Sequence, residues 1–174
     1  PHCLYIVGFM AGGKSTLGKR LSDRLGCPLH DTDNEVEKRL GMSVSEIFSR
    51  FGQSRFREEE RAVLHSLPPV GIVVTGGGLP CFHNNMAYMN SMGVTLYVDV
   101  PAHEIVSRLR DRQERSSRPL LKGLTDRQIS RFVEDGLRER APFYEQAAYR
   151  FRPQQESFDS LCALVRDICP RNIN

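Results

Sequence analysis

The sequence predicts a three-layer α/β/α domain around a five-stranded parallel sheet. Short apolar runs alternate with segments of helical spacing along the 174-residue chain, a pattern typical of strands joined by crossover helices. The runs IVVT (72–75) and TLYVDV (95–100) are almost continuously apolar, as expected of strands covered by helices on both faces. The length fits one domain with a sizeable core. We therefore expect residues 1–174 to form a single domain.

Each element of this fold has its own signal. The strands are predicted from the apolar runs at 3–7, 28–31, 71–75, 94–99 and 148–152. Helices are predicted at 14–25, 33–40, 43–51, 53–67, 82–92, 102–109, 126–140 and 158–168. In the first helix, Leu17, Leu21 and Leu25 recur every four residues and mark a buried stripe. Five of the eleven residues from 108 to 118 are arginines, so we expect residues 109–123 to form a mobile, charged lid.

Composition narrows the classes of function. The chain is 40% hydrophobic and 26% charged, with a net charge of +3, which is ordinary for a soluble globular protein. No apolar run approaches the ~18 residues of a membrane span, and no basic stripe is interleaved with aromatic residues as in single-strand nucleic-acid binders. The five cysteines include no Cys-x-x-Cys pair, which favours a reducing cytoplasm. No heptad pattern demands a dimer, so we expect a cytoplasmic monomer without membrane or nucleic-acid partners.

The stretch GFMAGGKST, residues 8–16, lies between the first predicted strand and helix. Gly8, Gly13, Lys14 and Ser15 match the pattern G-x-x-x-x-G-K-[ST], which we call the phosphate loop. Glycines allow backbone N–H groups to approach phosphate oxygens, and the following helix adds its positive dipole end. A lysine there bridges the β- and γ-phosphates, and a hydroxyl at the position of Ser15 ligates Mg²⁺. The predicted nucleotide contacts are Ala11, Gly12, Gly13, Lys14, Ser15 and Thr16.

The loop alone leaves the acceptor of the phosphoryl group open. The chain is short for a GTPase with added domains, and it has no Asn-Lys-x-Asp motif for reading guanine. A kinase acting on a small molecule or a nucleotide fits better. A glycine-rich turn with an exposed lysine is the structural alternative.

Further stretches, in order along most of the chain, narrow this choice. They are HDTD (30–33), SRFREEE (54–60), VVTGGG (73–78), SRPLL (117–121) and RAPFYEQAA (140–148). Together with the phosphate loop they resemble the shikimate kinase family. The resemblance implies a P-loop NTPase fold of the nucleoside monophosphate kinase type. It also implies transfer of the γ-phosphoryl group of ATP to the 3-hydroxyl of shikimate, with Mg²⁺, in aromatic amino acid biosynthesis.

The resemblance assigns the acid substrate to residues 33–60 and to two arginines. Arg57 and Arg140 match the family's carboxylate-binding arginines, and a planar guanidinium suits bidentate recognition of a carboxylate. Arg57 could instead pair with neighbouring glutamates on its helix. Arg140 could instead interact with the dipole of a helix end.

Asp33 matches the aspartate that accepts hydrogen bonds from substrate hydroxyls and that could act as the general base. Asp31 matches the aspartate that reaches Mg²⁺ through water. In an extended stretch, residues two apart face the same way, so both carboxylates could face one pocket. The alternative is a helix cap made by Thr32 or Asp33.

The glycines Gly76, Gly77 and Gly78 follow the third strand, where a parallel sheet binds its ligand. The resemblance places a ring-shaped substrate against them, with Gly77 the strongest candidate for donating a backbone N–H. A plain flexible turn is the alternative.

Arg118 matches the lid arginine that reaches the ATP phosphates, and with Asp33 and Lys14 it completes the predicted catalytic set. Arg110 is a candidate for stacking on adenine, and Gln154 is a candidate adenine contact. Three other arginines, at 108, 112 and 115, are interpreted as solvated surface.

The sequence departs from the family pattern in two places. Ala11 stands where the loop usually has glycine, at a cost on the order of 1 kcal/mol if that position needs a positive φ. The lid is also a residue or two longer than expected. Two alternatives to a shikimate kinase are another kinase of the same fold, such as a gluconate or nucleoside monophosphate kinase, and a nucleotide-binding switch without catalysis. The presence of both Asp31 and Asp33 disfavours the switch.

Overall fold

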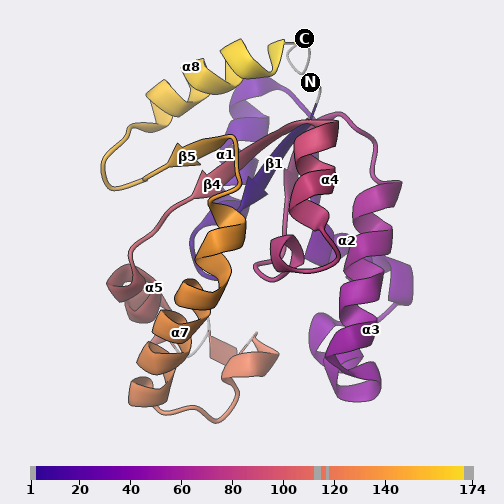
Figure 1. Ribbon diagram of the computed structural model, residues 1–174, viewed down its shortest axis with the longest axis vertical. Coiled ribbons are helices and arrows are strands. Elements are labelled where there is room, and N and C mark those ends of the chain that lie inside the picture. Colours follow the sequence, from indigo (N-terminus) through magenta and orange to yellow (C-terminus); the bar gives the residue numbers. More distant parts are fainter. Residues whose placement is uncertain (1–2, 112–114, 117, 171–174) are drawn as a thin grey trace.

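The computed structural model describes residues 3–111, 115–116 and 118–170. They contain a five-stranded parallel sheet with the order β2-β3-β1-β4-β5 (Figure 1). The strands are β1 (Cys3–Val7), β2 (Leu29–Asp31), β3 (Gly71–Val74), β4 (Val94–Val98) and β5 (Tyr149–Phe151). All five predicted strands are confirmed, most of them shorter by a residue or two at their ends.

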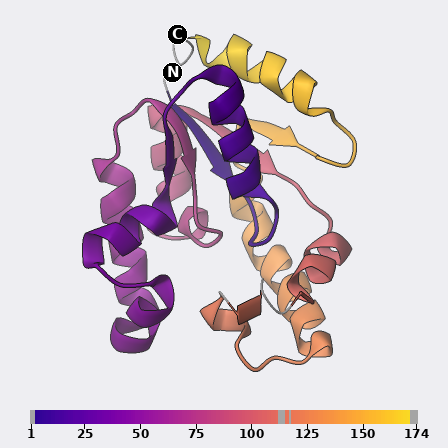
Figure 2. The ribbon, with the colours of Figure 1, turned by 180° about the vertical axis from the view of Figure 1, so that it is seen from behind.

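Helices cover both faces of the sheet, which confirms the three-layer prediction. They are α1 (Lys14–Leu25), α2 (Thr32–Leu40), α3 (Val44–Ser66), α4 (Asn85–Met92), α5 (Ala102–Leu109), α7 (Asp126–Tyr144) and α8 (Phe158–Ile168). Two 3₁₀ turns, η1 (Leu79–Cys81) and η2 (Pro119–Leu121), complete the elements. Helix α4 lies in front of the sheet in Figure 1, and α1 lies on the opposite face in Figure 2. Helices α2 and α3 form an arm at the β2 edge.

The two predicted helices at 43–51 and 53–67 are both present, joined into α3 across a kink. Gly52 forms this kink with φ 79° and ψ 177°, a conformation that glycine tolerates because it lacks a Cβ. Ser43 begins the first half with a capping box completed by Glu46. The second half carries the charged side chains of α3 that line the smaller cavity, Arg57 and Glu60.

Two helix boundaries differ from the prediction. Helix α4 begins at Asn85, because His83 and Asn84 have positive φ and the turn η1 precedes them. Helix α7 runs past Arg140 and through Pro142 to Tyr144. Proline normally disrupts a helix interior, but Tyr144 is fully buried and its hydroxyl donates a hydrogen bond to the Gly77 carbonyl. This tertiary contact keeps the last turn helical.

The main core lies between the sheet and its covering helices, where the predicted stripe of Leu17, Leu21 and Leu25 is buried. A second, smaller core holds the arm together and consists of Val36, Ile47, Phe56 and Val63. Burial of such side chains is favourable by about 1.5–3 kcal/mol each. The arm therefore has packing of its own beside the main core.

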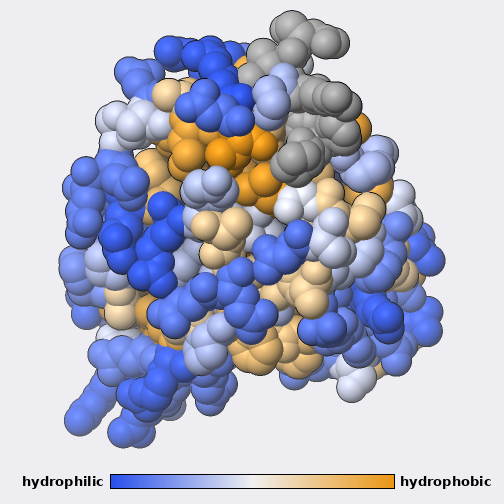
Figure 3. All heavy atoms as spheres, turned by 45° about the horizontal axis from the view of Figure 1, so that its top comes forward, coloured by the Kyte–Doolittle hydropathy of each residue, from blue (hydrophilic) through white to orange (hydrophobic). Residues whose placement is uncertain are grey.

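The surface adds two observations. Hydrophilic side chains cover much of the face seen in Figure 3, where the most hydrophobic residues gather near the top and smaller hydrophobic patches lie below them. In the part of the chain that the structure describes, no helix is both long and apolar enough to cross a membrane.

The predicted lid, 109–123, includes residues 112–114 and 117, which lie outside the described residues, so its mobility stays a prediction.

Candidate active site

The phosphate loop connects β1 to α1 at the carboxyl end of the sheet. Gly13 caps α1 with φ 84°, and Gly8 has φ 150°. Ala11 has φ 55°, so the alanine does occupy a left-handed position that disfavours residues with a Cβ. Its carbonyl accepts a hydrogen bond of 2.7 Å from Nη1 of Arg108 on α5.

Lys14 is held inside the loop. Its side chain is only 7% exposed, and Nζ donates a 2.8 Å hydrogen bond to the Phe9 carbonyl. Burial lowers the pKa of Lys14 to about 8, with Asp33 and Asp31 opposing the shift. The negative charges of a bound phosphate ligand would offset this desolvation penalty and favour the charged form of Lys14.

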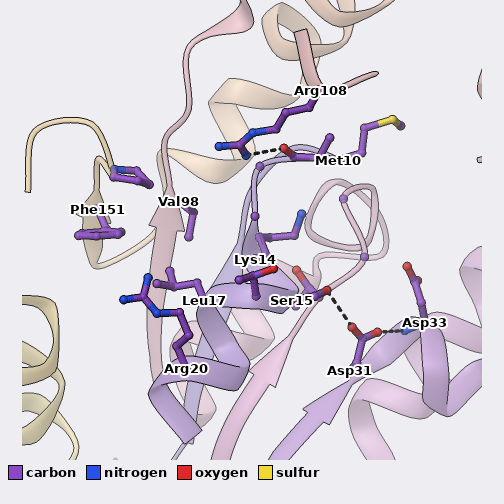
Figure 4. Close-up of a pocket in the computed structure, with 18 of the residues that line it drawn as sticks. Met10, Lys14, Ser15, Leu17, Arg20, Asp31, Asp33, Val98, Arg108 and Phe151 are labelled. Carbon is purple, nitrogen blue, oxygen red and sulfur yellow. Dashed lines mark hydrogen bonds between the residues drawn. The ribbon is translucent and has the colours of Figure 1, made fainter. Parts of the chain in front are cut away.

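A cavity of about 760 Å³ lies over the loop (Figure 4). It is lined by residues 10–17 and by side chains that are far apart in the sequence, including Arg108, Arg118, Pro153 and Phe158. A second cavity of about 380 Å³ adjoins it and faces the arm. Its lining includes Phe48, Phe56, Arg57, Glu60 and Arg140.

The two cavities share part of their lining. The shared residues are Met10, Ser15, Asp31, Asp33, Gly76, Gly77 and Arg118. Two ligands, one in each cavity, would therefore meet at this common wall. The wall holds the carboxylates of Asp31 and Asp33 and the guanidinium of Arg118.

Asp31 has two roles at the wall. Its Oδ1 accepts hydrogen bonds from the backbone N–H groups of Asp33 (3.0 Å) and Asn34 (3.3 Å) and so caps α2. Its Oδ2 accepts a 3.2 Å hydrogen bond from the Ser15 hydroxyl (Figure 4). The idea that Thr32 or Asp33 caps this helix is wrong. Thr32 instead accepts a hydrogen bond from the Gly76 N–H at 2.9 Å.

Asp33 is thereby left facing the cavities. Burial raises the pKa of its carboxyl to about 6, and the nearby Asp31 adds to the shift. Lys14 and Arg57 act in the opposite direction. A carboxylate poised in this range can accept a proton or a hydrogen bond near neutral pH.

Arg57 is 5% exposed and pairs with Glu60 at 2.6 Å, one turn away on α3. The alternative of pairing with a neighbouring glutamate is thus realised, yet the guanidinium also lines the smaller cavity. Its Cζ lies 4.5 Å from the centre of the Phe82 ring. The Arg57 side chain therefore has a fixed orientation.

Glu60 is a site residue that the sequence interpretation missed. It is 1% exposed, and its Oε1 has no hydrogen-bond partner among the described residues. Burial raises the pKa of Glu60 to about 7, against the effect of Arg57. The spacing of Arg57 and Glu60 at i and i+3 was the available signal.

Close approach of neighbouring side chains favours glycine at positions 76 and 78. A Cβ on Gly76 would lie 2.6 Å from Oδ1 of Asp33 and 2.8 Å from Oε1 of Glu60. A Cβ on Gly78 would lie 2.3 Å from Nη2 of Arg57. Gly77 is held through its carbonyl by Tyr144. A plain flexible turn would not need these contacts.

Other predicted residues divide into those that line the cavities and those that do not. Thr16 and Arg118 line the larger cavity, and Arg140 lines the smaller one. The Cζ atom of Arg140 lies 5.4 Å from the centre of the Phe9 ring. Arg110 and Gln154 line neither cavity, and Gln154 donates a hydrogen bond to Glu104 at 2.5 Å.

The arginines first interpreted as solvated surface also divide. Arg108 is exposed, with 41% of its side chain accessible, as the surface interpretation expects, but it also lines the larger cavity. Arg115 pairs with Asp126, and the arginine at 112 lies outside the described residues.

Comparison with known proteins identifies the family. A family model described as shikimate kinase matches residues 10–167. A shikimate kinase from Bacteroides fragilis is 43% identical over 148 residues, which cover 84% of this chain and 82% of the relative. The shikimate kinase from Aquifex aeolicus is 36% identical over 154 residues, or 87% of each chain.

Solved structures agree with the sequence matches. The crystal structure of shikimate kinase from Bacteroides thetaiotaomicron has a TM-score of 0.85 at 35% identity and covers 97% of this chain and 98% of its own. A shikimate kinase from Acinetobacter baumannii in complex with shikimate has a TM-score of 0.84 at 28% identity, with coverages of 99% and 96%. By the family model that matches most of its length and by these relatives, this chain belongs to the shikimate kinase family.

Proposed function

We propose that this chain transfers the γ-phosphoryl group of ATP to the 3-hydroxyl of shikimate, giving shikimate 3-phosphate and ADP in the synthesis of aromatic amino acids. The observation that carries the proposal is the pair of adjoining cavities with a common wall. One cavity is built on a phosphate loop, and the other presents two arginines to an organic acid. The reacting groups would meet at Asp33 and Arg118.

The larger cavity is assigned to ATP. Backbone N–H groups of the loop and the start of α1 would hold the phosphates. Lys14 would leave the Phe9 carbonyl for the β- and γ-phosphate oxygens. Arg118 lies on the wall between the cavities, where its charge would stabilise the transferring group. Both cations act on charge that develops during transfer.

The smaller cavity is assigned to shikimate. The carboxylate would bind Arg57 and Arg140, and the ring would lie against the backbone of the three glycines, with the Gly77 N–H as a donor. Asp33 would accept a hydrogen bond from the reacting hydroxyl. Its raised pKa leaves it largely ionised at neutral pH, ready to take the proton as the new O–P bond forms. Phosphoryl transfer needs little deprotonation beforehand, because its transition state is loose.

Ser15 and Asp31 fit a magnesium site. Their side chains are hydrogen-bonded to each other at 3.2 Å beside the phosphate loop. No group of three His, Cys, Asp or Glu side chains in the described residues could hold a metal by itself. This fits Mg²⁺, which usually takes few protein ligands and completes its shell with phosphate oxygens and water. The ion would neutralise phosphate charge, with Ser15 as direct ligand and Asp31 acting through water.

We also propose that the protein acts as a cytoplasmic monomer. The five cysteines are free thiols, and four of them are buried, which fits a reducing compartment.

The proposed reaction is tested by following ADP release with ATP and Mg²⁺. Shikimate, gluconate and CMP are compared as acceptors at equal concentrations. Release that depends on shikimate, with no more than background for the other two, is expected. Activity with gluconate or CMP and none with shikimate would refute the proposal, as would ATP binding without any acceptor-dependent release.

A further inference from the structure

We propose that Arg108 is a positioning residue for the phosphate loop, which acts by holding Ala11 in its left-handed conformation. The inference rests on the proposed binding of nucleotide by this loop. Glycine would adopt this conformation without help, whereas alanine needs an external contact to favour it. Arg108 would therefore compensate for the alanine at position 11.

The first observation is the backbone of Ala11. Its φ of 55° belongs to the left-handed region, which L residues other than Asn and Asp seldom adopt. The other non-glycine residues with positive φ in the described chain are His83 and Asn84, which lie in a turn away from the loop. Ala11 lies among the residues that line the larger cavity. A change in the φ angle of Ala11 would reorient the neighbouring peptide groups of the phosphate loop.

The second observation is the contact itself. Nη1 of Arg108 donates a 2.7 Å hydrogen bond to the Ala11 carbonyl, across 97 residues of sequence. The same Nη1 would lie 3.5 Å from a Cβ on Gly13, so the guanidinium spans the loop from Ala11 to the start of α1. Figure 4 shows the Arg108 side chain reaching the loop from α5 above the cavity.

The third observation is that Arg108 is itself held in place. Its Nη2 lies 3.5 Å from Oε2 of Glu104, one turn earlier on α5. The same Oε2 accepts a hydrogen bond from Gln154, which follows β5. The arginine is thus oriented from two elements that lie outside the loop, and the loop conformation depends on where α5 and the end of β5 are placed.

The test uses Arg108→Ala and Ala11→Gly, alone and together, with ADP binding measured by titration calorimetry without shikimate. We expect Arg108→Ala to weaken ADP binding about fivefold to thirtyfold, the factor that corresponds to the free-energy cost of a left-handed alanine. Shikimate affinity should change less than twofold. In the Ala11→Gly background, removal of Arg108 should weaken ADP binding by less than twofold, because glycine needs no support.

The controls separate this inference from simpler ones. Arg138→Ala removes an exposed helical arginine that pairs with a carboxylate, Asp135, three residues away, and should leave ADP binding unchanged. If Arg108 acts only by touching the nucleotide, its removal will lower ADP affinity by the same factor whether alanine or glycine stands at position 11. Such additive effects of the two substitutions would overturn the inference. Unchanged ADP binding in Arg108→Ala would overturn it as well. ADP binding is read without turnover, so failure of the proposed reaction would be seen separately.

Discussion

Replacement of Gly78 by alanine would test the acid-binding site with a single methyl group. The new Cβ would lie 2.3 Å from Nη2 and 2.6 Å from Cζ and Nη1 of Arg57, far inside contact distance. Gly78 itself has φ −92° and ψ −20°, which alanine adopts freely. The change therefore acts on Arg57 rather than on the backbone.

Arg57 has little room to yield. Its guanidinium is paired with Glu60 at 2.6 Å and lies 4.5 Å and 5.3 Å from the centres of the Phe82 and Phe56 rings. Displacing it would remove at least one charge-assisted hydrogen bond to a bound carboxylate, worth about 1.5–3 kcal/mol. We expect the dissociation constant of shikimate to rise about 10- to 150-fold.

The assay is calorimetric titration of the Gly78→Ala variant with shikimate, and separately with ADP. ADP affinity should stay within twofold of the unmodified chain, since Gly78 does not line the larger cavity. A thermal melt establishes that the variant is folded. Shikimate affinity within twofold of the original in a folded variant would refute the assignment of Arg57 to the carboxylate.

Other predictions concern the common wall and the second arginine. Asp33→Asn should leave ATP affinity within a few fold but lower kcat by about 10²–10⁴, measured by steady-state ADP release; near-normal turnover would remove Asp33 from catalysis. Because burial raises the pKa of Asp33 to about 6 in the free protein, kcat/KM for shikimate should fall as the pH drops through about 6 and the carboxylate is protonated, whereas a flat profile down to pH 5 would contradict this. Arg140→Ala should raise the KM for shikimate by tenfold or more and leave the KM for ATP nearly unchanged, and the reverse pattern would assign Arg140 to the nucleotide.

Much of the fold was predictable because its signals are local. Continuous apolar runs predicted the strands, and the glycine at position 52 divided two helical patterns where the kink of α3 is found. The phosphate loop was recognisable because its glycines and Lys14 occur in one contiguous stretch. Each of these features is determined by residues that are close together in the sequence, so it can be recognised without knowing the fold.

The rest depends on contacts between distant residues. Helix α7 passes through Pro142 because Tyr144 bonds to Gly77, 67 positions away. Arg108 looked like one more arginine of a charged run until α5 brought it to Ala11. The spacing of Glu60 from Arg57 allowed a pair between them, but only the fold shows that Glu60 is buried and lines the site, unlike Glu58 beside it. Such partners are determined by packing rather than by spacing.

The most direct test of the proposed function is a crystal structure of the protein with shikimate, ADP and Mg²⁺ bound together. We expect the shikimate carboxylate within hydrogen-bond distance of Arg57 and Arg140, the 3-hydroxyl beside Asp33, and the β-phosphate of ADP on the backbone N–H groups of residues 11–16. An acid bound away from both arginines, or a hydroxyl other than the 3-hydroxyl facing the nucleotide, would contradict the account.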